Sequence, residues 1–378
     1  MLLLHTSDWH VGRTFHGADL LADQARSLEH LAGLVAAHGV DVVLVAGDVY
    51  DRAVPNARSV QVCTRALEQI RDAGARIVVT PGNHDSAPRL GAAASFAAAG
   101  GLHLRTSTAE VDVPVLLDDD HGEVALYGLP FLEPDTARHV LRAPDAHSHA
   151  AVLGVAMDRV RADLATRPGT RSVVLAHAFV VGGQVSGSER TISVGGVETV
   201  PAGVFDGVDY VALGHLHSPQ VISERVRYSG SPLPYSFGER SHRKAAWLVE
   251  LDADGLGQVQ RLELPVVRGL SQLTGELDAL LTDPAHAPAE EHYVSAVLVD
   301  PVRPLDAMRR LQTRFPHAVH LQWQPPARSG VLRYAEKVRG RTDAAVVASF
   351  LTDVRSAPQT WEVELVSEGL RSRQEVDR

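Results

Sequence analysis

Short apolar segments alternate with longer amphipathic segments along the first two thirds of the chain. The short runs, rich in Val, Leu, Ile and Ala and bounded by polar turns, predict strands at residues 2–4, 42–46, 77–80, 124–129, 173–176, 210–213 and 245–251. Residues 20–37 and 57–73 carry apolar side chains at helical spacing. This alternation is typical of sheets covered by helices, so it predicts an α/β domain over residues 1–255.

The pattern changes after Leu251. The turn Asp252-Ala253-Asp254-Gly255 indicates the end of the first domain, and residues 258–267 are expected to begin another unit. Alternating segments follow: helix 270–281, strand 293–298, helix 305–314 and strand 318–324. They predict a small α/β domain over residues 256–326, which ends near Pro325-Pro326.

The last region, residues 327–378, contains one predicted amphipathic helix. Residues 343–355 place Val346, Val347, Phe350, Leu351 and Val354 along one side. This apolar side either packs on its own domain or docks into a partner protein, and the sequence favours neither alternative.

Composition adds expectations about the compartment. The single cysteine, Cys63, allows no internal disulfide, which favours a reducing environment. The first residues lack a basic leader and a signal-peptide core, and no run approaches the roughly 20 apolar residues of a membrane span. We therefore expect a soluble cytoplasmic protein without membrane association.

The net charge limits how the chain could bind nucleic acid. Its formal value is −10, whereas proteins that bind nucleic acid by themselves usually carry a basic face. Lysine occurs only at Lys244 and Lys337, so almost all basic residues are arginine. Arginine suits phosphate contacts, but coding bias explains the preference for arginine more simply. Binding to DNA would therefore need metal ions or a partner.

Five polar clusters each follow a predicted strand. They are Ser7-Asp8-Trp9-His10, Gly47-Asp48, Gly82-Asn83-His84-Asp85, Ala176-His177 and Gly214-His215-Leu216-His217. Because loops at the carboxyl ends of strands in an α/β sheet converge on one crevice, the five clusters are expected to form one site.

The residue types of these clusters suit a pair of divalent cations. Two cations need a shared carboxylate, for which Asp48 is the natural candidate, and further oxygen and imidazole ligands on each side. Residues two apart in extended backbone share a face, so both members of the pairs Asp8/His10 and His215/His217 can reach inward. Carboxylate, amide and imidazole ligands without a thiolate favour Mn²⁺, with Mg²⁺, Fe²⁺ or Zn²⁺ as alternatives. Two dications would leave the site positive and attractive to a phosphodiester.

Taken singly, most of these signals are weak. Asp48 alone could be a turn residue, and a lone histidine such as His177 could be structural. The five clusters together resemble the signature blocks of the calcineurin-like metallophosphoesterase superfamily, D-x-H, G-D, G-N-H-[DE], H and G-H-x-H.

Longer matches resemble the SbcD-type nuclease family within that superfamily. They are His5-Thr6-Ser7-Asp8-Trp9-His10, Gly47-Asp48-Val49-Tyr50-Asp51, Pro81-Gly82-Asn83-His84-Asp85-Ser86, Asp209-Tyr210-Val211-Ala212-Leu213-Gly214-His215-Leu216-His217 and Tyr228-Ser229-Gly230-Ser231-Pro232-Leu233. These blocks cover most of residues 1–240.

The resemblance implies a fold and a distribution of ligands. The expected fold is a β-sandwich flanked by helices, in αββα layers, with two Mn²⁺ ions bound. One ion would be held by Asp8, His10, Asp48 and His217, and the other by Asp48, Asn83, His177 and His215. His84 would be the catalytic histidine that is not a ligand, although it could instead only orient a ligand. Asp51 stands where some relatives have a histidine, and Asp85 is expected to orient neighbours rather than to bind metal.

The same resemblance implies a role and partners. The chain would be the exonuclease and hairpin or single-strand endonuclease subunit of a complex that processes DNA double-strand breaks. Residues 256–326 would form a capping domain, and the helix 343–355 would bind an SbcC-type coiled-coil ATPase. The chain would form a homodimer within a heterotetramer. Two alternatives remain at this point: a phosphoesterase that acts on a small nucleotide or cyclic diester, and a non-catalytic adaptor with the same fold.

Overall fold

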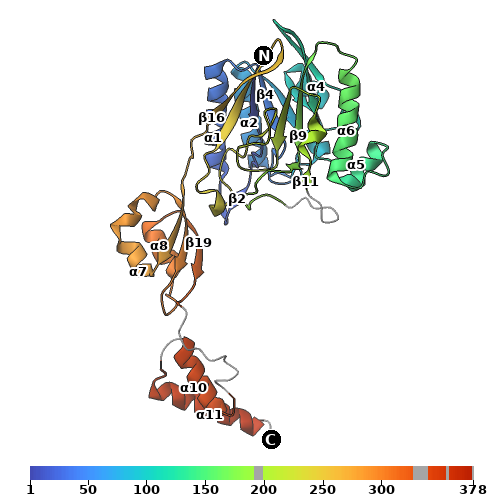
Figure 1. Cartoon of the computed structure of the whole chain (residues 1–378). Coiled ribbons are helices and arrows are strands. Elements are labelled where there is room, and N and C mark those ends of the chain that lie inside the picture. Colours follow the sequence, from blue (N-terminus) through green and yellow to red (C-terminus); the bar gives the residue numbers. More distant parts are fainter. Residues whose placement is uncertain (191–198, 327–338, 355–356, 377–378) are drawn as a thin grey trace. The chain divides into compact units, whose positions relative to one another are not determined.

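The computed structural model describes residues 1–190, 199–326, 339–354 and 357–376. The chain divides into two compact units, residues 1–270 and residues 271–378 (Figure 1).

Two six-stranded sheets form the centre of the first unit. The first sheet has the order β16 (Gly255–Glu263), β15 (Ala245–Asp252), β1 (Leu2–Thr6), β4 (Val42–Ala46), β5 (Arg76–Thr80), β6 (Leu102–Leu104). The second has the order β13 (Gln220–Val221), β14 (Val226–Tyr228), β12 (Tyr210–Gly214), β9 (Arg171–His177), β8 (Gly122–Gly128), β7 (Val115–Asp119). The central pairs of both sheets are parallel.

The apolar strands are explained by burial on both faces. Successive side chains of a strand point to opposite faces, so Leu3 and Leu44 lie in the core between the sheets, while Leu4 and Val43 lie under helices. A strand that is covered on both sides has no need of polar positions. The predicted strands therefore appear as continuous apolar runs.

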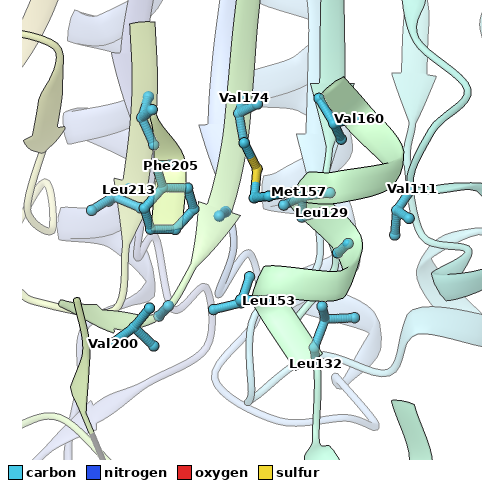
Figure 2. Close-up of a cluster of buried hydrophobic side chains, with 14 of the residues drawn as sticks. Val111, Leu129, Leu132, Leu153, Met157, Val160, Val174, Val200, Phe205 and Leu213 are labelled. Atoms are coloured by element: carbon cyan, nitrogen blue, oxygen red, sulfur yellow. The ribbon is translucent and has the colours of Figure 1, made fainter. Parts of the chain in front are cut away.

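Helices cover the outer face of each sheet. The helices α1 (Leu21–His38) and α2 (Ala57–Asp72) lie on the first sheet, and α5 (Pro134–Val140) and α6 (His149–Leu164) lie on the second (Figure 1). Figure 2 shows Leu153, Met157 and Val160 of α6 packed toward the strands. The αββα layers confirm the expected fold class.

Shorter elements complete this unit. They are β2 (Thr14–Phe15), β3 (Ala18–Asp19), α3 (Ala87–Leu90), α4 (Ala94–Ala99), β10 (Phe179–Val180), β11 (Thr199–Val200) and the 3₁₀ helices η1 (Thr108–Glu110), η2 (Ala202–Phe205) and η3 (Phe237–Glu239).

The expected domain end at residue 255 is not where the structure divides. The turn after Leu251 joins β15 to β16 in an antiparallel hairpin, so residues 255–263 extend the first sheet, and the unit continues to Leu270. The helix expected at residues 270–281 is also shorter than predicted. Residues 270–275 form a strand, and only Leu277–Thr282 are helical, because alternating polar positions in Leu270–Gly275 suit an extended backbone.

The second unit contains a three-stranded sheet with two helices and a separate helical pair. The sheet has the order β17 (Leu270–Gly275), β18 (Tyr293–Leu298), β19 (Ala318–Trp323). The helices α7 (Leu277–Thr282) and α8 (Ala307–Arg314) contribute to its buried core, and the 3₁₀ helix η4 (Pro284–Ala289) lies between α7 and β18. Farther along, α10 (Asp343–Val354) and α11 (Thr360–Val376) contact each other.

Parts of the last predicted region are not described by the structure. Arg355, the expected last residue of the helix 343–355, and residues 327–338 lie outside the described residues. Within the ranges that the structure describes, no helix combines the length and apolar character needed to cross a bilayer.

Candidate metal centre

The parallel strands place the five polar clusters at one edge of the sandwich. Asp8 and His10 follow β1, Asp48 follows β4, and Asn83 follows β5 in the first sheet, while His177 ends β9 and His215 and His217 follow β12 in the second. The seven side chains form what we call the ligand cluster. Six of them are buried, and Asn83 is half-buried. Polar groups at this depth require partners or a bound ion.

Asp48 occupies the centre of the ligand cluster. Its Oδ2 lies 3.5 Å from His10 Nε2 and 3.4 Å from His177 Nε2, which approach from different sheets. Its Oδ1 accepts a hydrogen bond of 2.9 Å from the backbone N–H of His84. A carboxylate between two sets of imidazoles is the geometry that a shared ligand needs.

On one side of Asp48, two imidazoles converge. His10 Nε2 and His217 Nε2 are 3.1 Å apart, and an oxygen of Asp8 lies within 4.8 Å of both. A hydrogen bond would require one of the two nitrogens to carry a proton, whereas a cation would use both lone pairs. Neutral imidazole nitrogens and a carboxylate are suitable ligands for such a cation.

On the other side, His177 and Asn83 face each other. His177 Nε2 is 2.9 Å from Asn83 Oδ1. His177 also forms a second three-residue group with Asp8 and Asp48. The ring of His215 lies edge-on to His177, with centroids 5.3 Å apart. The structure thus brings all seven predicted ligands together, in two groups that meet at the carboxylates.

The pKa values of the cluster follow from burial and mutual contact. Burial lowers the pKa of His10 well below its ordinary value and that of His215 to about 3, so both rings favour the neutral form that binds metal. Burial raises the pKa of Asp8 to about 6. Burial also opposes ionisation of Asp48, but the neighbouring His177 and His10 outweigh it and hold its pKa well below the usual range. For His177, burial is outweighed by Asp48, which raises the pKa to about 9.

Several members of the cluster have unusual backbone conformations. Asp8, His10, Asp48 and His215 have φ values of 53°, 45°, 52° and 105°, in a region that residues other than glycine rarely adopt. Such conformations cost on the order of 1–3 kcal/mol each and persist only where the surroundings enforce them. Here the backbone N–H of Asp8 donates to Gly47 O at 3.0 Å, and that of His10 donates to Asp48 O at 2.9 Å. The two loops therefore hold each other in the conformation that directs their side chains inward.

His84 borders the ligand cluster without being part of either group described above. Its Nδ1 lies 2.8 Å from the carbonyl oxygen of Asp51 and donates to it, while its buried Nε2 has no hydrogen-bond partner among the described residues and lies 4.0 Å from Asp48 Oδ2. It also makes a third group with His10 and Asp48 that has the spacing of metal ligands. Geometry alone therefore allows His84 to act on a bound substrate or to bind metal.

The two remaining predicted residues, Asp51 and Asp85, differ in position. Asp85 accepts backbone hydrogen bonds from Val49, Tyr50 and Gly82 at 2.9–3.0 Å, so it ties the loop after β4 to the loop after β5. Asp51 Oδ1 lies 3.8 Å from His10 Nδ1 and 3.8 Å from Arg13 Nη1. Asp51 also lines a pocket of about 260 Å³ beside the cluster.

Sequence reasoning missed the residues that surround His217. Ser188 Oγ lies 2.5 Å from His217 Nδ1 and donates to Glu239 Oε1 at 2.6 Å, and Glu239 forms a fully buried ion pair with Lys244. Burial opposes ionisation of Glu239, but Lys244 outweighs it and lowers the pKa to about 2. One signal was present in the sequence: Lys244 is one of only two lysines.

The ligand cluster fits a pair of divalent cations. It offers carboxylate, amide and imidazole groups without a thiolate, a combination that suits Mn²⁺, Fe²⁺ or Zn²⁺ better than Ca²⁺. The convergence of His10 and His217 supports this fit, because their two Nε2 atoms make a poor contact with each other.

Comparisons with known proteins gave one family match and several distant structural matches. A family model described as calcineurin-like phosphoesterase matches residues 1–219. Among solved structures, TT1561 of Thermus thermophilus is 13% identical with a TM-score of 0.38, and the match covers 69% of this chain and 98% of that one. A dimetal phosphatase from Danio rerio is 14% identical with a TM-score of 0.37, covering 70% and 99%. GAP50, described as the anchor in the inner membrane complex of Plasmodium, is 9% identical with a TM-score of 0.39, covering 88% and 99%.

Proposed function

The chain belongs to the calcineurin-like phosphoesterase family, and from that premise we propose that it is a metal-dependent phosphodiester hydrolase that cuts DNA. The observation that carries the proposal is the meeting of two histidine groups at Asp48, because a shared carboxylate is what a two-metal site requires.

The residues have distinct roles in this proposal. Asp8, His10, Asp48 and His217 would hold one cation, and Asp48, Asn83, His177 and His215 the other. When bound, the cations supply Lewis acidity, which lowers the pKa of water and neutralises charge on phosphate oxygens. Asp85 fixes the two loops that carry Asp48 and Asn83.

His84 would act on the substrate itself. The Asp51 carbonyl holds its Nδ1–H, so the ring is fixed in orientation and its Nε2 is left without a partner among the described residues. A histidine held in this way can protonate the leaving oxygen or stabilise charge in the transition state.

DNA is proposed as the substrate because of the matches to the SbcD-type nuclease family. The block from Tyr228 to Leu233 contains no proposed ligand, and Tyr228 is buried against the backbone near the site, where its hydroxyl donates to Ala178 O at 2.7 Å. A second candidate function is hydrolysis of a small nucleotide or cyclic diester. The full burial of Asp8 and His10 favours it, because a small diester reaches a recessed site more easily than a duplex does.

A partner would compensate for the acidic charge of this chain. The helices α10 and α11 expose Phe350, Val354 and Trp361 by 48%, 54% and 59%. We assign these side chains to the binding of an SbcC-type coiled-coil ATPase, in a heterotetramer that contains a homodimer of this chain. Co-purification with that ATPase should be lost in Phe350→Asp and Trp361→Asp, and its retention in both variants would contradict the assignment.

The two candidate substrates can be separated directly. The full-length chain would be incubated with Mn²⁺ and either linear duplex DNA, hairpin DNA or bis-p-nitrophenyl phosphate, with a chelator as control. The proposal predicts that DNA and the small diester are both hydrolysed, and that the chelator stops both reactions. Hydrolysis of the small diester without degradation of any DNA would contradict the nuclease function and support the second candidate.

A further inference from the structure

The ligand His217 is held at three points by residues outside the ligand cluster. Its backbone N–H donates to Glu189 Oε1 at 3.2 Å, and its backbone carbonyl accepts from Lys244 Nζ at 2.7 Å. Its ring nitrogen Nδ1 contacts Ser188 Oγ at 2.5 Å. Both its backbone and its ring are therefore fixed.

The contact with Ser188 determines which ring nitrogen carries the proton. A serine hydroxyl has a single hydrogen, and Ser188 donates it to Glu239 Oε1 at 2.6 Å, since a carboxylate can only accept. The hydroxyl oxygen must then accept from His217, so Nδ1 carries the proton. The lone pair is left on Nε2, the nitrogen that faces His10 Nε2 at 3.1 Å.

Glu239 is itself kept ionised and fixed in place. It is fully buried against Lys244, and its Oε1 also accepts from the backbone N–H of Tyr235 at 3.2 Å. Lys244 Nζ donates in addition to Ser231 Oγ at 2.9 Å. The acceptor that orients Ser188 is thus anchored by a buried cation.

The segment that carries Ser188 is fastened by Glu189. The carboxylate of Glu189 accepts from the backbone N–H groups of Ser186, Gly187 and Ser188 at 2.8–3.1 Å, in addition to that of His217. One side chain therefore ties this segment to the backbone of the ligand. In contrast, the buried Nδ1 of His10 makes no hydrogen bond among the described residues.

We propose that Ser188 is a positioning residue, which together with Glu239 fixes His217 in the Nδ1–H tautomer and thereby sets the affinity of the cation bound by Asp8, His10 and His217. The inference rests on the proposed metal-dependent function. Groups that orient a metal-bound histidine in this way typically change metal affinity by about 10–100-fold when they are removed.

Ser188→Ala tests the proposal through metal binding. In a Mn²⁺ titration, wild type should bind two ions, and the variant should bind one ion with unchanged affinity and the other about 10–100-fold more weakly. Ser188→Thr, which keeps a hydroxyl, should recover most of the lost affinity. Ser236→Ala is the matched control, because Ser236 Oγ accepts from Gly238 N at 3.1 Å beside Glu239 and does not contact His217. Equal affinities in wild type and Ser188→Ala would overturn the proposal.

A second readout needs no metal, and its decisive result comes from the wild type alone. Nitrogen-15 NMR of the metal-free wild type should show His217 with its proton on Nδ1, and Ser188→Ala should show a mixture of tautomers. An Nε2–H tautomer in the wild type would overturn the proposal even if the variant failed to fold. If wild type instead showed the Nδ1–H tautomer but bound no Mn²⁺, the proposed metal-dependent function would be contradicted. The orienting contact between Ser188 and His217 would still be supported. Glu239→Gln is a poorer test, because it leaves the buried Lys244 without its counter-charge and is expected to destabilise the fold.

Discussion

His84 is the residue whose role depends most on what binds beside it. Its ring is anchored to Asp51 and its Nε2 is free of hydrogen bonds among the described groups. We predict that His84→Ala retains two Mn²⁺ ions and loses about 10²–10⁴-fold in the rate of phosphodiester cleavage, the usual contribution of a general acid.

A metal titration and a cleavage assay on the same preparation check this prediction. His103→Ala is the control, since His103 lies on β6 away from the cluster. Loss of one ion in His84→Ala would make His84 a ligand, as its group with His10 and Asp48 allows. An unchanged cleavage rate would show that His84 takes no part in the cleavage reaction.

Sequence pattern predicted which residues would meet, but not how they are held. The meeting of these seven side chains could be predicted because each lies at or just after the carboxyl end of a strand and is of a type that binds metal. The left-handed backbone of Asp8, His10 and Asp48 could not, because it depends on hydrogen bonds between loops that are distant in sequence. The contacts that Ser188 makes with His217 and Glu239 could not be predicted for the same reason: they join residues 29 and 51 positions apart.

At the scale of elements, the approach of the two sheets limits side-chain size at one position. A Cβ on Gly214, at the end of β12, would overlap the carbonyl oxygen of Ala46 at the end of β4. We predict that Gly214→Ala destabilises the chain by about 1–3 kcal/mol, as over-packing does, and weakens Mn²⁺ binding because His215 is displaced.

Gly154→Ala is the matched comparison. Gly154 lies within α6, where an added Cβ would meet nothing within 4 Å, so alanine should stabilise the chain by about 0.5–1 kcal/mol. Urea unfolding of both variants measures the two effects. Equal stabilities of Gly214→Ala and wild type would show that the strand ends are farther apart than described.

The elements were predictable to different degrees. Strands buried on both faces, such as Val42–Ala46, stand out as apolar runs. The helix α6 was not among the predicted elements, although Val152, Leu153, Ala156, Met157 and Val160 have helical spacing. Residues 258–267 were assigned to another unit because the turn Asp252-Ala253-Asp254-Gly255 indicates a break, but this turn joins two neighbouring antiparallel strands of one sheet.

For the whole molecule, one buried arginine links the two sheets. Arg171 begins β9 and donates to both oxygens of Asp119, at 3.0 and 2.5 Å, and to the carbonyl oxygens of Leu251 and Asp252 at 3.2 Å. The hydrogen bonds from Arg171 hold the pKa of Asp119 below its ordinary value of 3.8. The ionised carboxylate therefore stabilises the fold fully above this ordinary value, and the contribution is lost as the pH falls through the lower pKa of the folded state.

We predict that Asp119→Asn lowers the free energy of unfolding at pH 7 by about 1.5–3 kcal/mol, the range for hydrogen bonds to charged groups. The difference in the free energy of unfolding between Asp119→Asn and wild type should become smaller as the pH is lowered below 3.8. Asp118→Asn, an exposed neighbour, should change stability by less than about 0.5 kcal/mol. Urea unfolding across this pH range measures these free energies. A difference between Asp119→Asn and wild type that grows on acidification would contradict the lowered pKa of Asp119.

Two cations that share one aspartate are the centre of the proposed chemistry. A crystal of the full-length chain soaked in Mn²⁺, with diffraction recorded at the manganese absorption edge, tests this directly. We predict two anomalous peaks, both in contact with Asp48, one beside Asp8, His10 and His217 and the other beside Asn83, His177 and His215. A single peak, or two peaks that do not share Asp48, would contradict the two-metal site.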